Sequence, residues 1–154
     1  MNYRFGLIWL RAFRDGPEAV RELYADDFFF QDMVLDALFD ETTMDAQPRD
    51  RDAFVQRTAF CSNTDPSNGI GIHDFQLKDY LGDETCGVIL WTWTATDCAS
   101  FLGVPTGGRT ISTNGHTWQR YEDGKITRSS ACVDVIPVLG QLGLPVERDF
   151  GARL

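Results

Sequence analysis

Apolar side chains in the N-terminal part of the chain recur every three or four positions, the spacing of one helical face. A first helix over residues 3–14 is predicted by Phe5, Ile8, Trp9, Ala12 and Phe13. Pro17 marks the expected start of a second, short helix. Asp50 is placed to cap a third helix that runs to about Cys61. The chain therefore begins with a predicted helical layer.

From residue 70 onward the apolar period changes to two, the period of β-strands. Strands are predicted over residues 70–77, 88–96, 110–121 and 126–134, with a bulge near His73 and Asp74. In the second of these strands, Ile89, Trp91, Trp93 and Ala95 share one face.

Three shorter segments complete the predicted architecture. Residues 28–30 are three consecutive phenylalanines and predict an earlier strand. Glu-Asp-Gly-Lys at residues 122–125 is a hairpin signal, and a short helix is expected around residues 138–142. Helices followed by hairpin-connected strands favour an α+β domain with an antiparallel sheet, and residues 1–154 are interpreted as one domain.

The net charge of the chain limits the classes of molecule that it is expected to bind. Asp and Glu outnumber Lys and Arg by 23 to 14, for a formal net charge of −9. Binding to nucleic acid needs an excess of cationic side chains, so neither nucleic acid nor an anionic membrane surface is an expected partner. The apolar run near the N-terminus is too short for a signal peptide or a membrane span, and we expect a cytoplasmic protein.

Few residues are available to bind a metal. The four cysteines show no Cys-x-x-Cys spacing, and the chain has two histidines, so a zinc site would need carboxylate ligands as well. We expect reduced structural thiols, no metal site and no cofactor.

Four segments, in order along the chain, resemble those of SnoaL-like polyketide cyclases, which belong to the ketosteroid isomerase and nuclear transport factor 2-like superfamily. They are Tyr-Ala-Asp-Asp at 24–27, Phe-Leu-Gly-Val-Pro-Thr-Gly-Gly-Arg at 101–109, Arg-Tyr-Glu-Asp-Gly-Lys-Ile at 120–126 and Gly-Gln-Leu-Gly at 140–143. The resemblance implies a cone-shaped fold, with N-terminal helices packed on a curved antiparallel sheet that encloses an apolar pocket. It also implies a homodimer, but no single reaction, because the fold hosts several.

The chain departs from the enzymes it resembles at catalytic positions. The strand after Asp-Gly-Lys-Ile holds Ser129 and Ala131 where the cyclases typically carry a His and an Asp. The Arg-x-Asp pair of limonene epoxide hydrolases is replaced by Trp-Thr-Trp at 91–93. Residues 25–32, in contrast, resemble the segment of ketosteroid isomerase whose last Asp is the general base, a position that Asp32 occupies here.

Asp32 and His116 are the candidate catalytic residues. Beside apolar walls, the Asp32 carboxylate would gain a raised pKa and could move a proton to or from carbon; alternatively, it caps the following loop. His116 shares a strand face with Asn114 and Trp118. If that face points inward, His116 could stabilise charge on a substrate oxygen, whereas a register shift of one residue would turn it outward.

The remaining candidates are expected to bind substrate at the walls of the pocket. They are Trp9, Tyr24, Phe30, His73, Trp91, Trp93, Asn114, Trp118 and Ser129. Aromatic side chains at this spacing also build ordinary cores, and a histidine or serine in a strand needs no functional reason.

Two functions remain open from the sequence. The first is a cofactor-free isomerase, cyclase or dehydratase that acts on an apolar polyketide- or terpenoid-like small molecule of secondary metabolism. The second is a module of the same fold that binds a hydrophobic ligand, or dimerises, without catalysis. The missing cyclase His and Asp favour the second, and the position of Asp32 favours the first.

Overall fold

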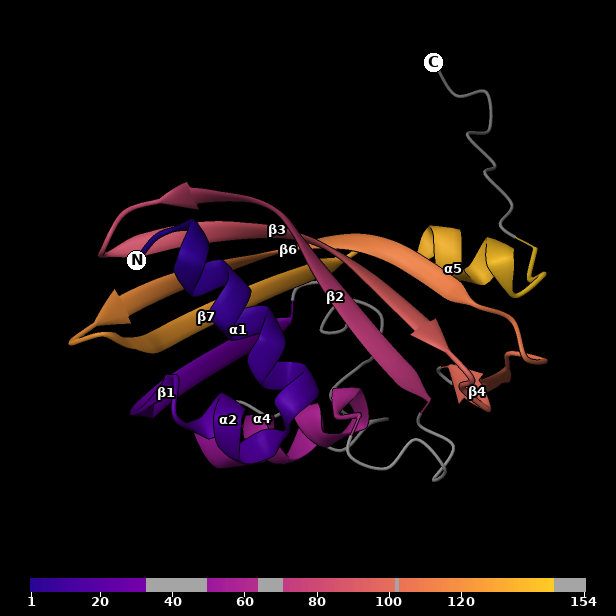
Figure 1. Ribbon diagram of the computed structural model, residues 1–154, viewed down its shortest axis with the longest axis horizontal. Coiled ribbons are helices and arrows are strands. Elements are labelled where there is room, and N and C mark those ends of the chain that lie inside the picture. The colour runs from indigo at the N-terminus through magenta and orange to yellow at the C-terminus, as the bar shows by residue number, and fades with distance from the viewer. Residues whose placement is uncertain (33–49, 64–70, 102, 146–154) are drawn as a thin grey trace, which may run out of the picture.

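The computed structural model describes residues 1–32, 50–63, 71–101 and 103–145, except for the side chains of Gln31 and Asp32. Its helical segments are α1 (Tyr3–Asp15), α2 (Pro17–Arg21), α4 (Arg51–Arg57), the 3-10 turn η1 (Thr58–Cys61) and α5 (Ile136–Gln141). The strands are β1 (Tyr24–Asp32), β2 (Ile72–Gly82), β3 (Cys86–Thr96), β4 (Ser100–Phe101), β5 (Val104–Pro105), β6 (Ile111–Glu122) and β7 (Lys125–Val133). Figure 1 shows α1, α2 and α4 gathered on one side of a curved sheet.

The N-terminal helices form where the sequence predicts them. The Asn2 side chain caps α1 by accepting a hydrogen bond from the Phe5 backbone N–H, and Pro17 opens α2. The Asp50 carboxylate accepts a hydrogen bond from the Ala53 backbone N–H at 2.8 Å and so caps α4. Each cap satisfies a backbone donor that has no partner within its own helix.

The main sheet has the strand order β1-β7-β6-β3-β2. Strands β2, β3, β6 and β7 are antiparallel, as predicted, whereas β1 pairs in parallel with β7 and makes the sheet mixed. The turn between β6 and β7 consists of Asp123 and Gly124, both with positive φ. This is the geometry of the tight hairpin that the sequence predicts.

Two irregularities change which residues face the helices. The predicted bulge near His73 is wrong, because His73 pairs regularly with Ala95. The register of β2 shifts at Lys78 instead, so Tyr80 rather than Leu81 continues the inward row. In β7 the register shifts between Ile126 and Arg128, and Thr127 is the extra residue. Each bulge reverses the alternation of side chains beyond it.

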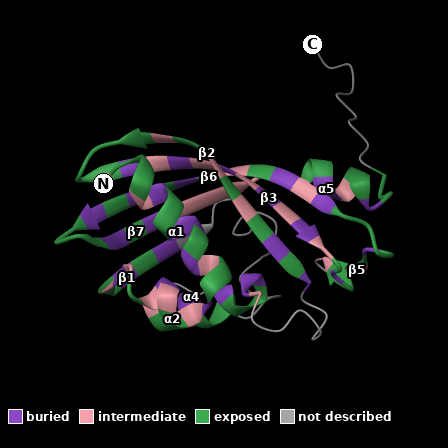
Figure 2. Cartoon of the chain, viewed as in Figure 1, coloured by how far each residue is buried: buried purple, intermediate pink, exposed green. Residues whose placement is uncertain are grey.

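The core lies between the helices and the inner face of the sheet. Burial alternates along β3, and Ile89, Trp91, Trp93 and Ala95 are buried as predicted. Figure 2 shows the same alternation along the strands. Within the described ranges, no helix has the length and apolar character needed to cross a membrane.

Candidate functional site

The inner face of the sheet brings residues from β1, β7 and β6 into cross-strand rows. One row contains Phe30, Ser129 and Gln119. The next row contains Asp32, Ala131 and Thr117. Because two residues of a strand span about 7 Å, these two rows lie within reach of one small molecule.

Two buried polar atoms in the first row lack partners. Gln119 is 0% exposed and Ser129 is 3% exposed. The amide nitrogen Nε2 of Gln119 and the hydroxyl oxygen of Ser129 have no hydrogen-bond partner in the described part of the chain. An unpaired buried polar group costs about 1–3 kcal/mol, so such groups mark places where another molecule is expected to bind.

The other end of the Gln119 amide has a partner. The Tyr121 hydroxyl donates a hydrogen bond to Gln119 Oε1 at 3.0 Å. The Tyr121 hydroxyl also lies 3.4 Å from that of Tyr80, whose hydroxyl is 3.2 Å from the Asp83 carbonyl oxygen. Burial raises the pKa of the Tyr121 phenol, so the phenol stays protonated at neutral pH and can donate.

Trp91 covers the middle of the inner face. Its indole N–H donates to the Thr117 hydroxyl at 3.0 Å. The ring lies directly against Gly115, where a Cβ atom would come within 2.3 Å of it. Glycine is therefore required for the indole to lie this close to β6, and Trp91 lies beside Thr117.

Aromatic rings from α1, β1 and α4 pack against one another in the core. The Trp9 indole N–H donates to the Tyr24 hydroxyl at 2.8 Å, and burial raises the pKa of Tyr24. Phe54 is at the centre of a cluster, with ring centroids 4.7 Å from Phe30 and 5.1 Å from Tyr24. The predicted pocket residues Trp9, Tyr24 and Phe30 are thus together in the interior.

His73 is buried and has well-defined partners. Its Nδ1 accepts a hydrogen bond from the Trp93 indole N–H at 3.0 Å, and its Nε2 lies 3.8 Å from the Cys98 sulfur. The Asn63 side chain pairs with both backbone groups of His73 at 2.8 Å. Burial raises the pKa of the Cys98 thiol, so this thiol is not activated as a nucleophile. These contacts favour a structural role for His73 and Trp93.

The expected inward orientation of His116, Asn114 and Trp118 is wrong. All three are exposed and lie on the outer face of β6. The inner face carries Thr117 and Gln119 instead, because burial follows the odd-numbered positions along the whole of β6, from Ile111 to Tyr121. His116 therefore does not face the interior rows.

The structure gives the backbone position of Asp32, at the end of β1. It pairs with Ala131 in the parallel β1–β7 ladder, while its side chain lies outside the described part of the chain. Its position has the same parity in β1 as Phe28 and Phe30, both of which are buried. The backbone of Asp32 therefore lies beside that of Ala131, next to the row of Phe30 and Ser129.

Sequence reasoning missed Gln119, because a glutamine does not stand out in a strand. The signal that identifies it is the short hairpin, which fixes the partner of Ser129 to within one residue.

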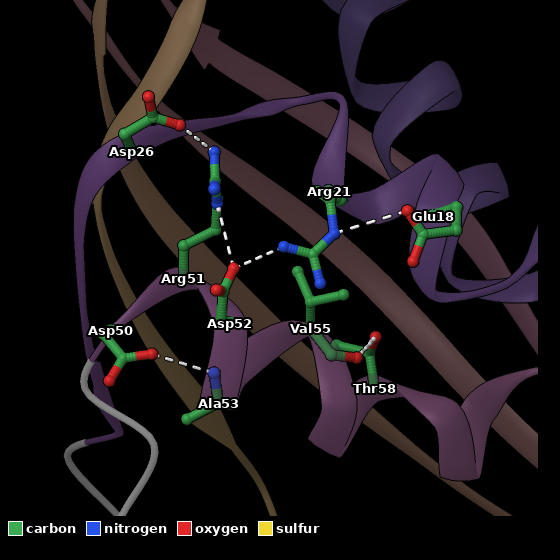
Figure 3. A network of polar contacts seen from close by, with 9 residues as sticks. All are labelled: Glu18, Arg21, Asp26, Asp50, Arg51, Asp52, Ala53, Val55 and Thr58. Carbon is green, nitrogen blue, oxygen red and sulfur yellow. Dashed lines mark hydrogen bonds and ion pairs between the residues drawn. The ribbon is translucent and has the colours of Figure 1, made fainter.

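A hollow of about 470 Å³ at the surface has a different character. Its charged lining includes Arg21, Arg51 and Asp26. Figure 3 shows that these charges pair with one another: Arg51 contacts Asp26 and Asp52, and Arg21 contacts Asp52 and Glu18. The hydrogen bond from Arg21 lowers the pKa of Asp52. This network joins α2, α4 and β1, and it leaves the interior rows as the candidate site.

In the described ranges, no three His, Cys, Asp or Glu side chains are grouped as metal ligands. The interior instead combines aromatic walls, hydroxyls and one amide. This set of groups suits an apolar molecule that carries a polar oxygen.

Comparisons with known proteins agree with this architecture. The model of the SnoaL-like polyketide cyclase family matches residues 9–142. None of the curated protein sequences compared with the chain matches it.

Among solved structures, IdmH from Streptomyces antibioticus, a candidate polyketide cyclase, is 23% identical with a TM-score of 0.69, covering 90% of this chain and 95% of its own. TsrD from Streptomyces laurentii is 16% identical with a TM-score of 0.70, covering 92% and 94%. A protein from Catenulispora acidiphila with a ketosteroid isomerase-like fold, in complex with trimethylamine, is 17% identical with a TM-score of 0.68, covering 94% and 96%.

Proposed function

Since the chain belongs to the SnoaL-like polyketide cyclase family, we propose that it is a cofactor-independent isomerase or cyclase acting on an apolar polyketide- or terpenoid-like small molecule. The observation that carries this proposal is the pair of unpartnered interior atoms, Gln119 Nε2 and Ser129 Oγ. They lie one row from the backbone position of Asp32.

The proposed reaction begins with proton transfer. The Asp32 carboxylate takes a proton from a carbon next to a substrate carbonyl, and the electron pair of the broken C–H bond moves onto the carbonyl oxygen. The N–H of Gln119 and the O–H of Ser129 stabilise the resulting enolate. The enolate carbon then either accepts the proton back, which gives an isomer, or attacks a second carbonyl of the same molecule, which closes a ring.

The surrounding residues exclude water from this step. Trp91 and the Phe54 cluster provide apolar walls, and the hydrogen bond from Trp91 to Thr117 holds the indole in place. The proposed reaction requires desolvation by these groups to raise the pKa of the Asp32 carboxylate, which makes it a stronger base towards carbon acids.

The test follows proton abstraction directly. The protein is incubated in D2O with 1-tetralone, and NMR measures deuterium entering the carbon next to the carbonyl. We expect Asp32→Asn to reduce this exchange by about 10²- to 10⁴-fold, while Asp27→Asn, at an exposed position of the same strand, retains it. Full exchange by Asp32→Asn would show that another group is the base.

One observation favours the non-catalytic alternative. Ser129 and Ala131 occupy the positions where the resembling cyclases typically carry their His and Asp. A ligand-binding protein would bind 1-tetralone without accelerating deuterium exchange in the wild type, so the same experiment separates the two functions.

We also propose that the chain forms a homodimer through the outer face of the sheet. Trp118 is 39% exposed there and pairs with the half-buried Val88. Light scattering of the wild type and of Trp118→Glu tests this, because a charge at the centre of an apolar contact should give monomers.

A further inference from the structure

We propose that Gln119 is held as a hydrogen-bond donor towards the interior, so that the site selects ligands carrying an acceptor oxygen at this position and rejects ligands carrying a donor. This inference rests on the proposed function, because it concerns the same interior site. It assigns Gln119 and Ser129 as specificity-determining residues and Tyr121 as a positioning residue.

The orientation of the amide follows from Tyr121. A side-chain amide has an acceptor end and a donor end, and a rotation of 180° exchanges them. The Tyr121 hydroxyl donates to Oε1 at 3.0 Å, which occupies the acceptor end. Nε2 is then the free end, and it has no partner in the part of the chain that the structure describes.

Tyr121 is itself held in place. The Tyr80 hydroxyl lies 3.4 Å from that of Tyr121. Both phenols lie against Gly87, where a Cβ atom would be 2.4 Å from the Tyr80 oxygen and 3.1 Å from the Tyr121 oxygen. The single hydroxyl proton of Tyr80 can be donated either to the Tyr121 oxygen or to the Asp83 carbonyl, which is 3.2 Å away. The Asp83 carboxylate accepts from the Thr85 N–H and hydroxyl at 2.7 Å and so fixes the β2–β3 turn beside Tyr80.

Ser129 adds a second donor. It is the direct cross-strand partner of Gln119, and its hydroxyl has no partner among the described residues. An amide N–H cannot accept a hydrogen bond, so one ligand atom that satisfies both groups must be an acceptor. A ketone, ester or quinone oxygen meets this condition, and the aromatic walls suit the rings that carry it. A site built around a fixed donor discriminates against ligands that would leave it unpaired.

The experiment uses three flat tricyclic probes that differ at one bridging group. Fluorene carries CH2, 9-fluorenone carries an acceptor C=O, and carbazole carries a donor N–H. Equilibrium dialysis measures the Kd of each probe for the wild-type protein. We expect 9-fluorenone to bind about tenfold tighter than fluorene, the effect of one net hydrogen bond, and carbazole to bind no better than fluorene.

Four variants assign the preference to residues. Gln119→Met should abolish the preference for 9-fluorenone over fluorene, and Ser129→Ala should reduce it. Ser130→Ala, on the outer face of the same strand and paired with Trp118, is the matched control and should keep it. Tyr121→Phe frees the amide to rotate, so the affinities for 9-fluorenone and carbazole should converge; a purely structural defect would weaken all three probes equally.

Two results would overturn this inference alone. Equal binding of fluorene and 9-fluorenone would mean that water satisfies Gln119 and Ser129, and tighter binding of carbazole would mean that the amide has the opposite orientation. Both leave the proposed function intact, because the interior still binds apolar rings. If none of the probes binds, the interior site itself is refuted, together with the proposed function.

Discussion

The inner and outer faces of the β6 and β7 strands contain similar kinds of side chain but differ in how far these side chains are buried. The inner face buries Thr117, Gln119 and Ser129 under aromatic rings. The outer face exposes His116 and Trp118. Residue type alone therefore does not distinguish the two faces, since each face carries polar residues and a large aromatic residue, Tyr121 inside and Trp118 outside.

Hydrogen bonding explains how the inner face tolerates polar residues. Thr117 accepts from the Trp91 indole, and Gln119 accepts from Tyr121, so most of the buried groups are paired. Among the residues that the structure describes, the buried side-chain atoms without a partner belong to Gln119 and Ser129, which share one cross-strand row. The inner face thus differs from the outer face in pairing most of its polar groups within the protein. The two polar groups without such a partner mark the candidate site.

The two faces should differ most in the loss of stability that follows removal of an aromatic ring. Phe54→Ala removes the ring at the centre of the inner cluster and should lower the free energy of unfolding by about 3–5 kcal/mol. Trp118→Ala on the outer face should change it by about 0.5 kcal/mol or less when measured on the monomer. Urea denaturation followed by circular dichroism measures both. Equal losses would contradict the assignment of the two faces.

A smaller effect is expected from filling the space beneath Trp91. Gly115→Ala places a methyl group against the indole, within 2.3 Å of its nearest atom, and should cost about 1–3 kcal/mol through overpacking. Gly140→Ala is the matched control, because a Cβ atom there meets nothing within 4 Å. Its melting temperature should equal or slightly exceed that of the wild type. An unchanged melting temperature for Gly115→Ala would show that Trp91 is free to move.

The smallest expected change in stability comes from removing single hydroxyls on the inner face, and it should differ between a paired and an unpaired hydroxyl. Thr117→Val leaves the Trp91 indole N–H without an acceptor and should cost about 1–2 kcal/mol. Ser129→Ala removes a hydroxyl that has no partner in the described ranges, so stability should be unchanged or rise by up to about 1 kcal/mol. Thermal unfolding of both variants, without ligand, checks this contrast. Destabilisation by Ser129→Ala would reveal a partner for its hydroxyl.

Local signals predicted most of the fold. Asp50 caps α4, and Asp123 with Gly124 forms the β6–β7 turn, as the sequence indicates. These features depend on a few neighbouring residues, whose conformational preferences act without the rest of the molecule. The family resemblance added the arrangement of helices on a curved sheet.

The candidate site was harder to predict because it depends on register. The bulge at Thr127 reverses the alternation of β7 relative to the hairpin and brings Ser129 opposite Gln119 instead of Trp118. No composition signal marks this extra residue, and one residue of shift exchanges the two faces of a strand. The burial of Trp9, Tyr24 and Phe30 could be predicted, because it does not depend on that register.

The parallel pairing of β1 with β7 has a consequence for how the chain folds. The hydrogen bond from Arg128 to the Asp27 carbonyl joins residues 101 positions apart. During synthesis, β1 therefore cannot form its strand pair until β7, the last strand of the sheet, has been made. Until then, the side chains of Phe28 and Phe30 stay exposed to solvent. Strand pairs between residues so far apart in sequence slow folding and leave partly folded intermediates prone to aggregation. We expect chaperone dependence and aggregation of nascent chains to be governed by this one edge of the sheet.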